Sequence, residues 1–271
     1  MFSPRWLAVA LRPLTSAVVA LGAVGFPALA QLSVSPLVIE STASQGQGQG
    51  VIILSNTGET PTRLRVYAEP FTYGRDGLEV LTESDQDLTP YLLFSPRELV
   101  IEPGQTRMVR LAARLLPSLG EGEFRAIVFT ESLETMPFGT DGNVTVGIIP
   151  RVGVTMYVRQ GNVAPALEVL SATVQPEDGR IALLVANAGD ATARPAVNWA
   201  LVHNGTTQAS GREGETTVIA GGDRNLMIDH TANQEPPLAP GTYTLSGTLT
   251  WTLDNRQETL PFSVPVTLPA P

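Results

Sequence analysis

Residues 96–111 read PRELVIEPGQTRMVRL and combine the local signals that decide the fold. A short apolar run, Leu99–Ile101, is followed by Pro103-Gly104 and then by a second run, Arg107–Ala112, with interleaved apolar and polar residues. Proline and glycine supply the backbone angles of tight turns, so two such runs around a Pro-Gly pair are typical of neighbouring strands. The segment predicts two short strands joined by a turn.

The rest of the chain repeats this pattern, and no stretch shows a sustained helical period. Asn204-Gly205 is a pair typical of two-residue hairpin turns. The expected strands are Leu32–Ile39, Val51–Asn56, Thr62–Tyr67, Leu99–Ile101, Arg107–Ala112, Phe124–Thr130 and Val144–Val158 in the first half, and Leu167–Val174, Arg180–Ala186, Ala196–His203, Thr216–Ala220, Asn225–Ile228, Thr242–Leu253 and Thr259–Val266 in the second.

Two sets of about seven strands, with turns every 8–12 residues or so, indicate two β-sandwiches rather than one large sheet. We expect an all-β protein with two immunoglobulin-like domains in tandem, at residues 31–159 and 166–271, with a linker at residues 160–165. Ser41–Gly50, in which glutamine alternates with glycine, is expected to be a mobile hairpin loop.

The first 30 residues carry the signals of export. Arg5 and Arg12 are basic, Leu14–Phe26 is apolar, and Ala28-Leu29-Ala30 places small residues before Gln31. This order is that of a secretory signal peptide cleaved before Gln31, and it predicts a periplasmic protein. The alternative is an uncleaved membrane anchor, but the apolar run is shorter than the ~20 residues that span a bilayer.

Composition narrows the function further. Loss of Arg5 and Arg12 with the leader changes the formal net charge from −9 to −11, which argues against nucleic acid as a partner. The chain has no cysteine and therefore no disulfide. All 17 basic residues are arginine, which excludes lysine-based catalysis.

No catalytic, cofactor-binding or metal-binding motif stands out. Asp223, Asp229 and His230 are close in sequence, but adjacent residues of a strand point to opposite faces, so a metal site is not expected there. The acidic stretch Glu83–Asp87 is interpreted as a solvated loop. We expect no enzyme activity, no small-molecule cofactor and no bound metal, although scattered catalytic carboxylates stay open as an alternative.

Three segments carry a resemblance to a known family. The opening strand Leu32–Ile39, the segment Phe94–Leu111 with its Pro-Gly turn and Val-Arg-Leu strand, and Phe124–Glu131 followed by Val144–Val158 resemble the N-terminal domain of the PapD-like periplasmic pilus-assembly chaperones. The likeness covers about 130 residues, and the second half resembles generic immunoglobulin-like modules.

The resemblance implies that the last strand of the first domain lends alternate apolar residues to an incomplete pilin sandwich. Val144, Val146 and Ile148 have the spacing that β-strand augmentation needs. The alternative is that these three side chains fill the core of their own domain.

The family also anchors its client's terminal carboxylate with an arginine and a lysine. Those positions correspond here to Leu37 and to Gly153 or Thr155, none of which is charged. Arg151 lies nearby and is a candidate substitute, because a guanidinium binds a carboxylate bidentately. The alternative is a solvated or cross-sheet-paired arginine.

The leading hypothesis is a chaperone-like or accessory protein for secreted pilus or surface subunits. Its expected partners are a pilin-like or surface subunit and an outer-membrane assembly platform. The alternative from another class is a displayed structural or adhesive protein.

Overall fold

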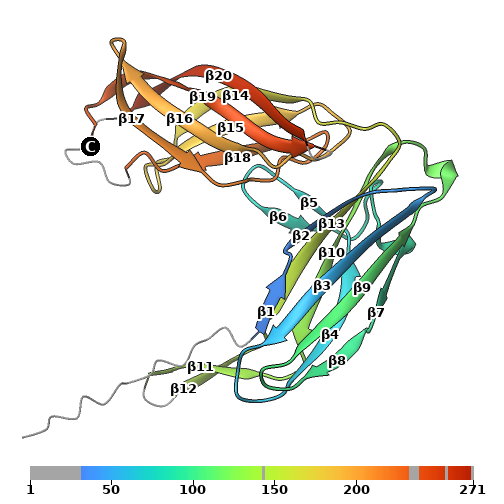
Figure 1. Cartoon of the computed structure of the whole chain (residues 1–271). Helices are drawn as coiled ribbons and strands as arrows, with labels where there is room; N and C mark the ends of the chain where they lie inside the picture. Colours follow the sequence, from blue (N-terminus) through green and yellow to red (C-terminus); the bar gives the residue numbers. More distant parts are fainter. Residues whose placement is uncertain (1–31, 142–143, 232–237, 254–255, 270–271) are drawn as a thin grey trace, which may run out of the picture.

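The computed structural model describes residues 32–141, 144–231, 238–253 and 256–269. The regular secondary structure of these residues consists almost entirely of strands, arranged in two groups of sheets (Figure 1). The first group contains β1 (Leu32–Ser35), β2 (Val38–Thr42), β3 (Gln47–Asn56), β4 (Thr62–Glu69), β5 (Phe71–Tyr73), β6 (Leu78–Val80), β7 (Leu92–Ser95), β8 (Glu98–Ile101), β9 (Thr106–Arg114), β10 (Gly122–Ser132), β11 (Met136–Asp141), β12 (Val144–Ile148) and β13 (Arg151–Gln160).

The first sandwich packs a four-stranded sheet, in the order β1-β3-β9-β7, against a five-stranded sheet, in the order β2-β13-β10-β4-β8. Successive side chains of a strand point to opposite faces, and those on the inner faces form the core. Ile52 and Leu54 of β3 are fully buried and belong to the same core cluster as Val154 and Met156 of β13. Two short 3₁₀ helices, Thr89–Tyr91 and Pro117–Leu119, lie in its loops. Among the described residues, no helix is long and apolar enough to cross a membrane.

The second sandwich consists of β14 (Leu167–Val174), β15 (Ile181–Asn187), β16 (Ala196–His203), β17 (Thr206–Glu213), β18 (Asp223–Ile228), β19 (Gly241–Leu253) and β20 (Arg256–Leu268). Its sheets run β14-β15-β18 and β17-β16-β19-β20. Asn204 and Gly205 have positive φ and join β16 to β17, as the hairpin pair predicted. The predicted all-β fold with two immunoglobulin-like sandwiches is therefore confirmed.

Four local predictions are wrong. The opening segment Leu32–Ile39 is not one strand, because β1 ends at Ser35 and β2 begins at Val38 in the other sheet. Val144–Val158 is not one strand, because the strand is interrupted at Ile149-Pro150, between β12 and β13. Thr216–Ala220 forms only an isolated bridge, from Val218 to Ala193. Gln47–Gly50 belongs to β3 and pairs with β9, so the stretch is a strand and not a loop.

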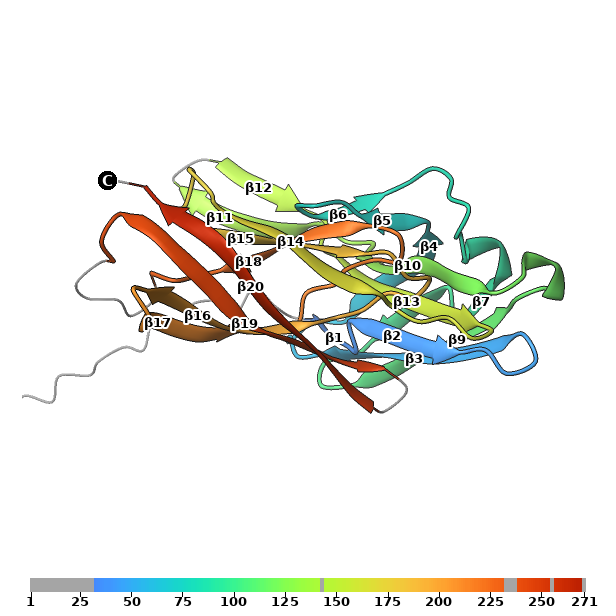
Figure 2. The same cartoon turned by 90° about the horizontal axis from the view of Figure 1, so that it is seen from above.

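The two sandwiches meet at an angle, and the two-stranded β5–β6 hairpin lies between them (Figure 1). Seen from above, the start of β18 in the second sandwich lies beside this hairpin (Figure 2). The signal peptide expected at residues 1–30 lies outside the described residues. Of the linker expected at residues 160–165, Gln160 is the last residue of β13 and the rest lies between β13 and β14. Independent folding of the two halves remains a prediction.

Candidate functional site

One long hairpin carries the predicted binding residues. β10 and β13 pair from Gly122–Gln160 to Glu131–Arg151, and β11 and β12 continue the same hairpin beyond the break at Pro150. Figure 1 shows β11–β12 projecting from the end of the first sandwich that faces away from the second. β12 therefore belongs to a two-stranded extension and not to the sandwich itself.

This extension has an open edge. β12 pairs with β11, and within the described ranges no strand pairs with its other edge. β2 pairs with β13 only from Thr155 onward, so Arg151–Val154 is also unpaired on that side. The open edge thus follows the chain from Val144 to Val154, interrupted at Ile149-Pro150. Such an edge presents backbone N–H and C=O groups that another strand can pair with.

Val144, Val146 and Ile148 occupy alternate positions of β12. The Ile148 side chain is 38% exposed and the adjacent Ile149 is 57% exposed, so neither fills the core of the sandwich. For Val144 and Val146 the structure defines the backbone position in β12. A binding role for the three residues remains a prediction.

Arg151 lies at the start of β13, on the outer face of the five-stranded sheet. Its guanidinium packs over the Phe129 ring, 4.1 Å from the centroid, and donates from Nη1 to the Tyr67 hydroxyl at 3.2 Å. Tyr67 in turn donates to Glu131 at 2.7 Å, and Arg65 pairs with the other oxygen of that carboxylate at 2.6 Å. Arg151 is thus positioned by a cross-sheet network, as its structural alternative supposed, while its side chain stays exposed.

The same network sets the ionisation of its members. The hydrogen bond from Tyr67, together with the pairing with Arg65, holds the pKa of Glu131 below its ordinary value against the opposing effect of burial. The hydrogen bond to Tyr67 raises the pKa of Arg151. Both groups are charged at neutral pH, so this corner of the sheet carries two arginines and one carboxylate.

The positions that align with the family's carboxylate-binding arginine and lysine lie side by side, but the residues present here carry no charge with which to bind a carboxylate. Thr155 donates its N–H to the Leu37 carbonyl at 3.0 Å, so the aligned positions are neighbours in space. A Cβ atom at Gly153 would lie 2.5 Å from Cδ1 of Ile127 and 3.0 Å from the Phe129 ring. The space for a lysine side chain is therefore already filled.

A buried ionic cluster that sequence reasoning missed joins the two sandwiches. Arg159 donates from Nε to Glu123 at 3.1 Å and from Nη2 to the Thr192 carbonyl at 2.9 Å. Glu123 also accepts hydrogen bonds from the N–H and the hydroxyl of Thr192. Glu40 lies 3.6 Å from Arg159, and burial raises the pKa of this glutamate. Glu123 and Arg125, two residues apart in β10, were the available signal in the sequence. Such spacing shows that two side chains share a face of the strand, but it does not show what covers that face.

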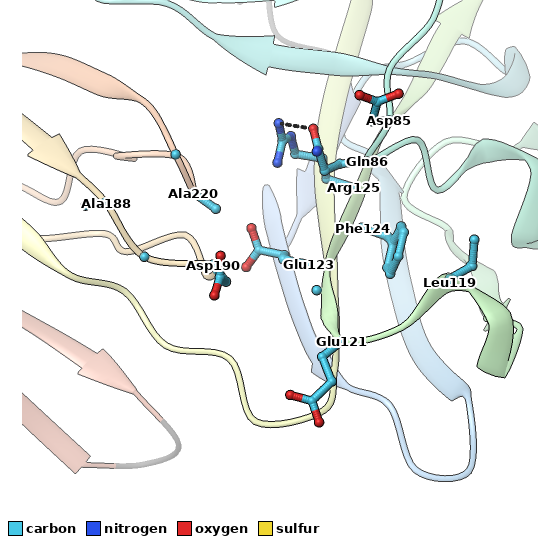
Figure 3. Close-up of a pocket in the computed structure, with 13 residues that line it drawn as sticks. Asp85, Gln86, Leu119, Glu121, Glu123, Phe124, Arg125, Ala188, Asp190 and Ala220 are labelled. Atoms are coloured by element: carbon cyan, nitrogen blue, oxygen red, sulfur yellow. Dashed lines mark hydrogen bonds between the residues drawn. The ribbon is translucent and has the colours of Figure 1, made fainter.

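Beside this cluster lies a cavity of about 350 Å³ between the two sandwiches (Figure 3). Arg125 lies in its wall, is 5% exposed, and donates from Nη2 to Gln86 at 3.4 Å. Burial lowers the pKa of Arg125. Asp85, Glu121 and Asp190 give the wall a mainly acidic character.

A second feature lies on the four-stranded sheet. Val51, Ile53, Leu93 and Met108 lie on its outer face and are 41–55% exposed. Ile53 and Met108 are directly opposite each other across β3 and β9. We call these four residues the apolar face. Clustered exposed apolar side chains often mark a protein interaction surface.

No protein-family model matches the sequence, and no curated protein matches it significantly. Among solved structures, the chain is similar to the class 5 fimbriae chaperone CfaA, with 11% identity, a TM-score of 0.48, and coverage of 86% of this chain and 98% of that one. It is also similar to a chain of the CsuC–CsuE chaperone–tip adhesion subunit pre-assembly complex from the archaic chaperone-usher Csu pili of Acinetobacter baumannii, with 16% identity, a TM-score of 0.49, and coverage of 88% and 98%. A third similar structure is the Salmonella enterica SafA pilin in complex with the SafB chaperone, with 12% identity, a TM-score of 0.45, and coverage of 88% and 96%. These likenesses concern the arrangement of the strands.

Proposed function

We propose that this chain is a non-enzymatic, periplasmic chaperone-like or accessory protein that binds secreted pilus or surface subunits by β-strand augmentation. The observation that carries the proposal is the open edge from Val144 to Val154, on a hairpin that projects beyond its own sandwich. Export signals in residues 1–30 support the periplasmic location, and N-terminal sequencing of the mature protein should begin at Gln31.

In this proposal, affinity comes from main-chain hydrogen bonds to a strand of the subunit. Specificity comes from Val144, Val146 and Ile148, which enter successive apolar pockets of that subunit. Complete burial of each such side chain contributes about 1.5–3 kcal/mol before the cost of association. No nucleotide hydrolysis is required, because the subunit is released when a competing strand replaces β12.

Arg151 is the proposed carboxylate-binding residue beside this edge. One of its N–H groups is used by Tyr67, and the others have no partner within the described residues. The guanidinium lies over the Phe129 ring, and the residue is exposed, so a carboxylate can approach its remaining N–H groups. Arg151→Ala should weaken subunit capture, and Arg151→Lys should restore it only partly because an ammonium group lacks the fork.

The apolar face is the proposed contact for an outer-membrane assembly platform. It belongs to the four-stranded sheet, whereas the open edge belongs to the five-stranded sheet and its hairpin. A subunit on the open edge therefore leaves the apolar face accessible. Ile53→Asp with Met108→Asp should block transfer of the subunit to the membrane while preserving capture.

The decisive experiment places charge on β12. Proteins that co-purify with the tagged chain from its native periplasm are identified by mass spectrometry, and the main partner is then co-expressed with each variant. Val146→Asp with Ile148→Asp should abolish capture, because an unpaired charge in an apolar pocket costs several kcal/mol. Thr145→Asp, on the same strand but the other face, is the matched control.

Thermal melts separate this proposal from its rivals. Lost capture with an unchanged melt supports binding by β12, whereas a collapsed melt assigns these residues to the core. Unchanged capture with an unchanged melt contradicts the proposed binding strand. A chain that captures no partner but self-associates would instead support the displayed structural protein.

A further inference from the structure

The β5–β6 hairpin and its turn, residues 71–80, form a strap between the two sandwiches (Figure 1). Its strands pair only with each other among the described strands. One side of the strap contacts the start of β18 in the second sandwich, and its inner side covers the outer face of β10 and β13. The strap therefore interacts with both halves of the molecule at once.

The outward contacts of the strap are polar and specific. Arg75 binds both carboxylate oxygens of Asp223, from Nε at 3.0 Å and from Nη2 at 2.6 Å. Asn225 donates its N–H to the Arg75 carbonyl at 3.0 Å and its Nδ2 to Asp76 at 2.9 Å. Arg224 donates to the Gly74 carbonyl at 2.8 Å. The Arg75 side chain is 58% exposed, so water and salt weaken this ion pair.

The inner side of the strap covers polar groups that it satisfies only in part, since the Phe71 carbonyl accepts a hydrogen bond from Nε of Arg125 at 3.4 Å. Phe71 is fully buried and packs edge-on against Tyr157, with centroids 5.8 Å apart. Arg125 and Tyr157 lie directly opposite each other across β10 and β13. Arg125 Nη1, Tyr157 Oη and Thr155 Oγ1 are buried and have no hydrogen-bond partner within the described residues. Burial of such groups opposes closure, because each forms hydrogen bonds with water when exposed.

The two sides of the strap therefore act in opposite directions. Exposed polar contacts to β18 and the burial of Phe71 favour the closed position, while three unpaired polar atoms favour opening. We propose that the strap is a reversible latch, which opens locally without unfolding of either sandwich and then exposes Arg125 and Tyr157 beside the junction of the domains. This device is independent of the subunit-binding edge and would operate whatever the chain binds.

Amide hydrogen exchange of the full mature chain tests the latch. Asp223→Asn and Arg75→Gln should each accelerate exchange at residues 71–80 by about threefold to tenfold, while amides in the centres of β10 and β16 keep their protection. Glu98→Gln is the matched control, because it removes an exposed ion pair to Arg63 within the first sandwich. Tyr157→Phe removes one unpaired hydroxyl and should slow exchange at the same residues.

Opposite shifts from the Asp223 and Tyr157 variants, with no shift from Glu98→Gln, are the expected result. The latch is overturned if residues 71–80 exchange at the rate of the β10 centre, since the strap would then open only by unfolding. It is equally overturned if neither Asp223→Asn nor Arg75→Gln changes exchange there. Faster exchange in Tyr157→Phe would show that the hydroxyl stabilises closure and would also contradict the latch.

Discussion

At the scale of single residues, Gly153 shows why the family's anchor is not transferred. Replacement of Gly153 with alanine should destabilise the first sandwich by about 1–3 kcal/mol, because the new Cβ would overlap Ile127. Ile127→Val removes the clashing Cδ1, so the double variant should lose less than the sum of the single losses. Urea unfolding measures all three, and Gly214→Ala, where no atom lies within 4 Å of the new Cβ, is the control. Additive losses would contradict the steric explanation.

Glu131 gives a prediction about pH at the same corner of the sheet. Its folded-state pKa is held down by Tyr67 and Arg65, so its stabilising contribution is present above the ordinary glutamate pKa of about 4.3 and disappears as pH falls through the lower folded value. Glu131→Gln should therefore have a lower Tm than the parent at pH 7. The two melting curves should converge near pH 3, and a constant difference across that range would argue against an ionic cause.

Sequence alone identified Arg151 as a candidate but not its neighbours. The contacts of Arg151 with Phe129, Glu131 and Tyr67 depend on the register in which β10 pairs with β13 and with β4. Such a register is fixed by turn geometry and by packing over the whole hairpin. Nothing in the local sequence of Arg151 specifies that register. The charge was predictable, whereas the network that positions it required the fold.

At the scale of elements, the glutamine–glycine stretch shows how composition misled the prediction. Gly48 and Gly50 lie in β3, where a Cβ would come within 2.7 Å of Val158 and 2.9 Å of Ile39. The glycines are needed because side chains of β13 and β2 occupy the inner side of the strand. An alternating glutamine–glycine sequence is compatible both with a flexible linker and with a strand whose inner side is covered by large side chains. Only tertiary packing distinguishes the two.

The edges of the two sandwiches differ in a way that suits the proposed function. β20 is a 13-residue edge strand, and Pro261 and Pro265 lie in it opposite Thr248 and Thr244 of β19. Because proline lacks an N–H, these residues reduce the capacity of the free edge to pair with another chain. β12 contains no proline.

Removal of this protection should make the second domain self-associate. Pro261→Thr with Pro265→Thr restores two donors on the outer edge of β20, so sedimentation velocity should show oligomers that increase with protein concentration. Pro269→Thr, just beyond the end of β20, is the control. A monomeric double variant would show that another feature protects this edge.

At the scale of the whole molecule, the two sandwiches and most of their strands followed from turn spacing and alternation, which are local properties. The junction did not, because it is built from pairs separated by tens of residues: Glu123 with Thr192, and Arg75 with Asp223. The strands expected from the sequence, Phe124–Thr130 and Val144–Val158, each stop one residue short of Glu123 and Arg159, so nothing in the sequence placed either residue in the junction. The two side chains are 2% and 7% exposed, and Thr192 of the second sandwich contacts both of them.

This dependence can be measured by comparison of the full mature chain with a fragment of residues 32–161. The fragment should melt cooperatively, because the first core is complete without the second sandwich. In the full chain, Glu123→Gln leaves Arg159 buried without its main carboxylate partner and should cost on the order of 3 kcal/mol. In the fragment, Thr192 is absent and water reaches both side chains, so the same substitution should cost less than about 1 kcal/mol. Equal losses in the two contexts would mean that the ion pair acts within the first domain alone. A fragment that fails to fold would show that the junction is part of a single cooperative unit.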